Sequence, residues 1–189
     1  GELRLSDKKL IFIRHSFQDN VLVVNRSTVA GYHQNFDAVI TKQKDFVLAQ
    51  GVADCGNLMI ADQDKKFVGL IHGSWHTTKL NIIEKTLSLA CKLYQVQPKD
   101  IVASFGPMLC WDCFEFGLEA GDIFNSQYLK LKAGKYYFNN KQMMLDQLLS
   151  FGINVENIWD ANICTLESEN FYSYRKANKL GLPTGRFLN

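Results

Sequence analysis

The chain has 189 residues, the length of one ordinary domain, and 47% of them are hydrophobic, enough for a core that needs no disulfides. The formal net charge is only +2 and the lysines and arginines are scattered, which argues against the basic stripe that nucleic-acid binding favours. No apolar run approaches the ~20 residues of a membrane span, and an odd number of cysteines without a disulfide pattern indicates a reducing, cytoplasmic compartment.

Apolar and β-branched runs predict strands in the first half of the chain. They cover residues 9–14, 20–24, 38–42 and 46–53. The runs 58–61 and 67–72 flank a polar turn, so they predict an antiparallel hairpin.

Apolar residues at helical spacing predict two helices in the second half. The first covers 80–94, with Thr77 or Thr78 as its N-cap, and the second covers about 140–151 and ends at Gly152. Between them, 101–105 is predicted to be a buried strand. The C-terminal stretch is expected to be irregular until a short strand at 186–188. Strands outnumber helices and most connections are short, so the predicted fold class is α+β.

Two segments carry residues suited to catalysis. Asp54 and Cys55 stand at the end of an apolar strand, and the glycine that follows would let a ligand approach the thiol closely. His72 and His76 flank Trp75 where a strand gives way to a helix, a place where rigid elements aim catalytic groups. The plainer alternatives are a buried structural cysteine and histidines without a catalytic role.

If Cys55 ends one strand and His72 ends its hairpin partner, the two side chains lie near each other. Two chemistries then remain open. His72 could hold Cys55 as a thiolate nucleophile, with Asp54 as a possible orienter, for amide or ester hydrolysis. Alternatively, both side chains could bind zinc or copper, with a third ligand and an open position for water.

Two other groups of residues have less specific patterns. Arg175 and Arg186 could hold a phosphate through their guanidinium groups, or simply be solvated. Cys110 and Cys113 form a Cys-x-x-Cys pair, but no second pair accompanies it, so it gives little support to a zinc or redox site. Cys113 and Cys164 are expected to pack beneath the site.

Several short motifs resemble those of the YfiH-type laccase-domain family, also called the polyphenol oxidase or peptidoglycan editing factor family. They occur in the family's order at 52–55 (Val-Ala-Asp-Cys), 68–75 (Val-Gly-Leu-Ile-His-Gly-Ser-Trp), 105–107 (Phe-Gly-Pro), 113–117 (Cys-Phe-Glu-Phe-Gly), 164–165, 171–175 and 184–186. The resemblance implies a compact α+β sandwich that forms a single domain over 1–189, with the family's N-terminal part shortened.

The resemblance also implies a metal centre made by one cysteine and two histidines, with zinc expected and copper as an alternative. Carried over by motif, Cys55 and His72 are two of its ligands. When the chain is aligned on the Val-rich run 21–24, Phe17 stands where the family has its first histidine, so the metal could be lost. His15 or His76 could supply the third ligand, and His33 is another candidate.

The family's activities imply a metal-dependent enzyme that processes purine nucleosides, by phosphorolysis or by deamination of adenosine, with a link to the editing of peptidoglycan precursors. The residues expected to take part are Cys55, His72 and Asp54 in catalysis and Trp75, Arg175 and Arg186 in binding substrate or phosphate. A metal-free cysteine hydrolase and a non-catalytic binding protein are the alternatives. A multicopper laccase is disfavoured because the chain has only four histidines.

The expected partners are a purine nucleoside and phosphate, with neither nucleic acid nor membrane, and the expected state is a monomer or small homo-oligomer.

Overall fold

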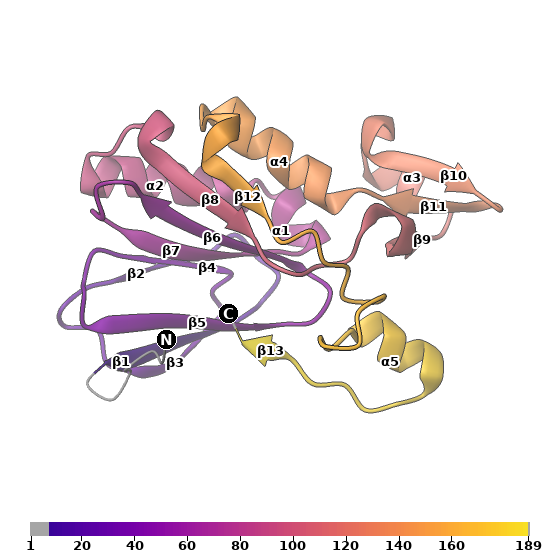
Figure 1. Ribbon diagram of the computed structural model, residues 1–189, viewed down its shortest axis with the longest axis horizontal. Coiled ribbons are helices and arrows are strands. Elements are labelled where there is room, and N and C mark those ends of the chain that lie inside the picture. The colour runs from indigo at the N-terminus through magenta and orange to yellow at the C-terminus, as the bar shows by residue number, and fades with distance from the viewer. Residues whose placement is uncertain (1–7, 189) are drawn as a thin grey trace.

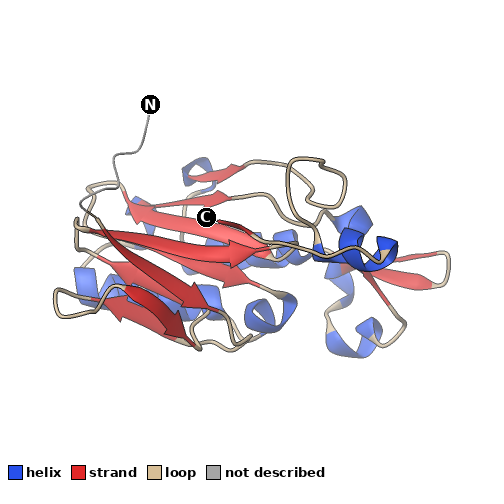
Figure 2. Ribbon diagram, turned by 90° about the horizontal axis from the view of Figure 1, so that it is seen from below, coloured by secondary structure: helices blue, strands red, loops and turns tan. Residues whose placement is uncertain are grey.

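The computed structural model describes residues 8–188, and these residues form three β-sheets (Figure 1). The largest has the order β12 (Ile158–Asp160), β8 (Ile101–Phe105), β6 (Gly56–Asp62), β7 (Val68–Gly73), β4 (Ala38–Thr41) and β2 (Val21–Val24). The second has the order β13 (Phe187–Leu188), β5 (Phe46–Val52), β1 (Lys9–Arg14) and β3 (Gly31–Gln34). The third, β10 (Leu129–Lys132), β11 (Lys135–Phe138) and β9 (Glu115–Phe116), lies at one end of the molecule (Figure 2).

The two larger sheets pack face to face, and helices cover the outer face of the six-stranded one (Figure 1). Side chains of a strand alternate between its two faces. Val39 and Leu70 therefore point into the core between the sheets, whereas their neighbours Ile40 and Ile71 point into the core beneath the helices. This double burial explains the continuous apolar runs of β4 and β7, and it confirms the predicted α+β class.

The helices and short 3₁₀ turns complete the fold. The helices are α1 (Trp75–Lys79), α2 (Ile82–Tyr94), α3 (Ala120–Ile123), α4 (Asn140–Phe151) and α5 (Tyr174–Leu180). The 3₁₀ turns are η1 (Pro98–Asp100), η2 (Trp111–Cys113), η3 (Ser126–Tyr128) and η4 (Val155–Asn157). Within the described part of the chain, no helix is both long and apolar enough to span a bilayer.

Most of the predicted elements are confirmed. The β6–β7 hairpin pairs Leu58 with Ile71, and α4 ends at Gly152, whose φ of 101° is readily adopted by glycine. The short predicted strand at the C-terminus is β13, one residue shorter at its start.

Two predictions at helix ends are wrong. Thr77 and Thr78 do not cap the helix that contains Tyr94; they belong to α1, which is capped by Ser74, and α2 begins after Asn81. The C-terminal stretch is not wholly irregular, because Ser173 accepts a hydrogen bond from the backbone of Lys176 and so starts α5. Both errors arise where a serine cap begins a helix of seven residues or fewer.

A tight contact in β7 allows a test of the sheet packing. A Cβ on Gly69 would lie 2.8 Å from Cγ2 of Ile40 and 2.9 Å from the carbonyl oxygen of Val39. We expect Gly69→Ala to lower the free energy of unfolding by about 1–3 kcal/mol through overpacking. Val68→Ala, at a neighbouring position that is 46% exposed, should cost less than about 1 kcal/mol. Urea denaturation measures both, and equal losses would contradict the packing described here.

Candidate functional site

A cavity of about 850 Å³ opens where the ends of β1, β5 and β7 meet the third sheet and the C-terminal segment. This volume is within the range of sites that bind small molecules. Eight of the residues predicted for the site line it, namely His15, Asp54, Cys55, His72, Trp75, His76, Arg175 and Arg186. Phe17 also lines it, whereas His33 does not.

The cavity-lining residue His72 forms a buried pair with Asp37. Nδ1 of His72 donates to Oδ1 of Asp37 at 2.8 Å, and the backbone N–H of His72 donates to the Asp37 carbonyl at 2.8 Å. Both side chains are almost fully buried. Because Asp37 occupies Nδ1, only Nε2 of His72 remains to meet a thiol or a metal ion.

Cys55 adjoins His72, as its position before β6 requires. Gly56, the next residue, is the cross-strand partner of Gly73, the residue after His72. Burial alone would lower the pKa of His72, but its interactions with the Cys55 sulfur and with the Asp37 carboxylate together raise it to about 9. In the metal-free chain this electrostatic arrangement favours an imidazolium held between a sulfur and a carboxylate.

The second carboxylate oxygen of Asp37 shapes the loop that carries His15. Oδ2 accepts the backbone N–H groups of Ser16 and Gln18 at 3.0 Å each and the Ser16 hydroxyl at 3.1 Å. Phe17, between them, has a φ of 59°. The strand therefore stops at Arg14, so His15 and Phe17 do not share a strand face.

The His15 ring nevertheless reaches the site. It stacks on His72 with ring centroids 3.6 Å apart and ring planes 6° apart. The metal-binding atoms of His15, Asp37 and His72 all lie within 4.8 Å of one another. Burial, and then the charge of His72, lower the pKa of His15 to about 3, so its imidazole is neutral and has a free lone pair.

The other two histidines have different surroundings. His76 stacks on Trp75 at 3.4 Å between ring centroids and lies beside the Phe17 ring at 5.9 Å. His33 is in β3, and its Nε2 lies 2.9 Å from the carbonyl oxygen of Val29. Of the candidates for a third ligand, His15 is thus the one placed against His72.

Asp54 does not contact His72. Its carboxylate accepts the Thr165 hydroxyl at 2.7 Å and the backbone N–H of Arg175 at 2.7 Å, and its own carbonyl accepts the N–H of Leu109 at 3.0 Å. The residue that orients His72 is Asp37, which sequence reasoning missed. The two are separated by 35 positions, and an aspartate before an apolar strand is too common to identify such a partner.

The two arginines reach the cavity from the C-terminal segment. The Arg175 guanidinium lies 5.2 Å from the centre of the Phe114 ring and donates to the carbonyl of Glu115. Arg186 precedes β13, which pairs with the end of β5, and its positive charge contributes to lowering the pKa of His15. Trp75 packs edge-on against Phe124, with ring centroids 5.6 Å apart.

Comparisons with known proteins show the family to which the chain belongs. The family model described as multi-copper polyphenol oxidoreductase laccase matches residues 1–189, and the chain belongs to that family. It is 28% identical over 162 residues to a purine nucleoside phosphorylase of Bacteroides thetaiotaomicron, a match that covers 81% of this chain and 59% of the relative. It is 29% identical over 178 residues to another of that name from Borreliella burgdorferi, covering 89% and 75% of the two chains. A protein named adenosine deaminase, from an unknown prokaryotic organism, is 26% identical over 162 residues, covering 81% and 60%.

Solved structures share the fold. The structure of the hypothetical protein YfiH of Bacillus licheniformis superimposes with a TM-score of 0.86 at 22% identity, covering 97% of this chain and 73% of that one. YlmD of Geobacillus stearothermophilus gives a TM-score of 0.83 at 22% identity, covering 96% and 72%. The chain thus spans about three fifths to three quarters of these relatives.

The contacts of Asp54 predict a structural role that a substitution can test. In Asp54→Asn an amide N–H₂ would face either the Thr165 hydroxyl or the Arg175 N–H, leaving a buried donor unpaired. We expect a loss of about 2–3 kcal/mol in the free energy of unfolding. Asp64→Asn, in a turn where the side chain is 74% exposed, should change it by less than about 1 kcal/mol. Equal denaturation midpoints for the two variants would show that the Asp54 contacts contribute nothing.

Proposed function

We propose that the cavity binds a purine nucleoside and that the chain processes it at a metal centre formed by Cys55, His72 and His15. The observation that carries the proposal is that a thiol and two imidazoles line one cavity, with the His15 ring stacked on His72 and His72 oriented by Asp37. The names of the relatives, purine nucleoside phosphorylase and adenosine deaminase, support the same class of substrate.

The donor set fits a zinc ion. Catalytic zinc sites use three protein ligands drawn from cysteine, histidine and carboxylate side chains, with a fourth position open for water. The Asp37–His72 hydrogen bond is the outer contact that zinc-binding histidines usually have. Nε2 of His15 is buried and has no hydrogen-bond partner of good geometry among the described residues, although the side chain of Gln50 lies close to the ring. Bound there, zinc would supply a Lewis acid and lower the pKa of a bound water.

The aromatic walls suit a purine. Phe17, Tyr32, Trp75 and Phe116 line the cavity together with the cysteine and the histidines. Flat aromatic side chains stack on a planar base and bury its apolar faces. These rings favour a nucleoside over a peptidoglycan precursor as the substrate.

The arginines suit an anion next to the ribose. Each guanidinium carries five N–H donors, and Arg175 uses one on the carbonyl of Glu115. In phosphorolysis a phosphate oxygen bonds to the anomeric carbon while the bond from that carbon to the purine nitrogen breaks. Arg175 and Arg186 would hold the phosphate for that attack, whereas deamination of adenosine would need no phosphate.

A metal-free hydrolase is a second candidate, because the Cys55, His72 and Asp37 side chains form a thiol–imidazole–carboxylate series. In this arrangement His72 would take the thiol proton and Cys55 would attack an ester or amide carbon. Asp37 would take the orienting place that sequence reasoning gave to Asp54. The two candidates differ in their need for metal.

We expect protein purified without added metal to contain zinc, and the Cys55→Ala and His15→Gln variants to contain about one zinc per chain less. Phosphate-dependent cleavage of inosine or adenosine should fall in parallel. Elemental analysis and release of free base measure the two properties. Cys91→Ala, in α2 and away from the cavity, is the control and should match the wild type. Unchanged zinc in the Cys55→Ala variant would sink the metal centre, and rapid alkylation of Cys55 would then favour the hydrolase.

Arg186→Gln should raise the KM for phosphate roughly 10- to 100-fold, the cost of one hydrogen bond between charged groups. The KM for the nucleoside should change much less, because the substituted side chain would contact the anion. Arg26→Gln, on an exposed turn, is the matched control. Equal effects on both KM values would contradict a phosphate site at Arg186. Steady-state kinetics at varied phosphate decides between the outcomes.

A further inference from the structure

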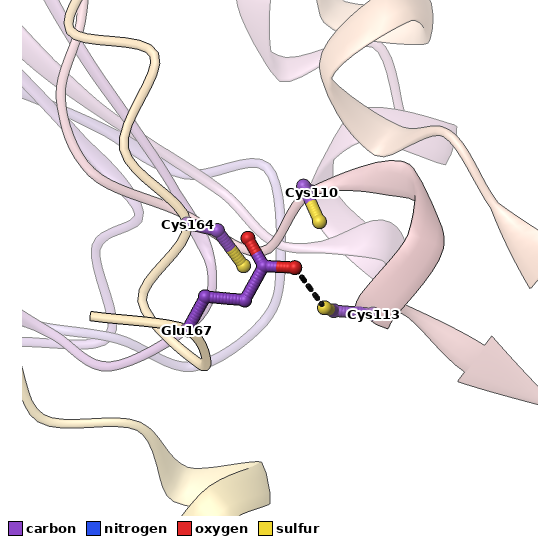
Figure 3. Close-up of side chains that lie close together, drawn as sticks. All are labelled: Cys110, Cys113, Cys164 and Glu167. Carbon is purple, nitrogen blue, oxygen red and sulfur yellow. Dashed lines mark hydrogen bonds between the residues drawn. The ribbon is translucent and has the colours of Figure 1, made fainter.

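Outside the cavity, the fold gathers a second set of metal-binding side chains. Sγ of Cys110, Cys113 and Cys164 and a carboxylate oxygen of Glu167 all lie within 4.8 Å of one another. Figure 3 shows the four side chains converging from two separate segments, with the Glu167 carboxylate between the cysteines. The thiol of Cys113 lies 3.5 Å from Oε1 of Glu167, its partner 54 positions along the chain. All three cysteines are free thiols.

The four residues form two pairs, each with the two-residue spacing of a zinc knuckle, a tight turn that presents two ligands to one zinc ion. Cys110 precedes η2 and Cys113 ends it, with two residues between them, and Cys164 and Glu167 have the same separation. The sequence showed only the first half of this pattern, because the second half ends in a carboxylate rather than a thiol. Zinc sites commonly draw their ligands from two such turns.

The backbone holds the two turns together without the side chains. Met108 and Cys164 form a parallel bridge, in which the N–H of Met108 donates to Ile163 at 3.1 Å and the N–H of Thr165 donates to Met108 at 3.2 Å. Within the turns, Cys113 N–H donates to Cys110 at 3.1 Å, and Ser168 N–H donates to Cys164 at 3.0 Å. The ligand positions are thus set before any ion binds.

We propose that Cys110, Cys113, Cys164 and Glu167 bind a structural zinc ion. A tetrahedron with Zn–S bonds of about 2.3 Å places its sulfurs about 3.8 Å apart, so the observed cluster needs only a small contraction. Thiolates select zinc over magnesium or calcium, which prefer oxygen. The four protein ligands fill a tetrahedral shell, so this site stabilises structure and leaves no position open for substrate.

The site would fasten the segment that carries the arginines of the cavity. Cys164 precedes Thr165, whose hydroxyl binds Asp54, and Asp54 in turn binds the N–H of Arg175. The zinc would therefore join η2 to the loop that leads into α5. This role does not depend on the proposed reaction.

The test uses the full chain in the Cys55→Ala background, which removes the cavity site alone. We expect this variant to retain about one zinc per chain, and Co²⁺ in its place to give the visible and thiolate charge-transfer absorption of a tetrahedral cysteine site. The further change Cys164→Ser should abolish both signals, whereas Cys91→Ser should leave them unchanged. Zinc at about 100 times its Kd should raise the Tm of Cys55→Ala by about 5–10 °C, and this shift should vanish with Cys164→Ser.

If Cys164→Ser does not fold, Glu167→Gln decides the question, because Glu167 is exposed and its replacement leaves the packing intact. It should weaken zinc binding at least about 10-fold. Absence of zinc and cobalt binding in the Cys55→Ala protein would overturn the proposal. So would unchanged affinity in the variants, or a disulfide between two of the three cysteines in the freshly purified protein. Because the cavity site is already removed in Cys55→Ala, zinc and cobalt binding in this background reports only on the cysteine and glutamate cluster, so the two proposals fail independently.

Discussion

One buried carboxylate, that of Asp37, organises the candidate site. A charge removed from water must be met by hydrogen bonds, and here both oxygens are used: Oδ1 by His72, and Oδ2 by the loop at Ser16 and Gln18. The two partners come from different sheets, β7 in the six-stranded sheet and the end of β1 in the four-stranded one. The interaction therefore joins the halves of the sandwich at the point where the cavity opens.

Asp54, between β5 and β6, also joins separate segments through hydrogen bonds. It has a φ of 82°, and its carboxylate and carbonyl accept three hydrogen bonds from three separate segments. Through them the strand end that carries Cys55 is tied to the segment that carries Arg175. Cys55 and Arg175, to which we assign the metal and the phosphate, thus share one support, which fits the need for catalytic side chains to be held in place before substrate binds.

The two sets of metal-binding side chains differ as catalytic and structural zinc sites differ, in whether a coordination position is left open. The cavity set has one thiol and two imidazoles around a space that a substrate can enter. The other set has three thiols and a carboxylate that close on one another. Open coordination suits catalysis and closed coordination suits structure, so one chain can use the same ion for both purposes.

The sequence by itself determined the strands and helices with clear periodicity, the α+β class, and the proximity of Cys55 to His72, because a hairpin register follows from local patterns. It also carried the family motifs. Only the tertiary structure decided that Asp37 rather than Asp54 orients His72, that His15 reaches the site despite Phe17, and that Glu167 completes a knuckle pair with Cys164 opposite Cys110 and Cys113. Each of these depends on contacts between residues far apart in the chain, and on turns such as that at Phe17, whose backbone conformation no side-chain pattern encodes.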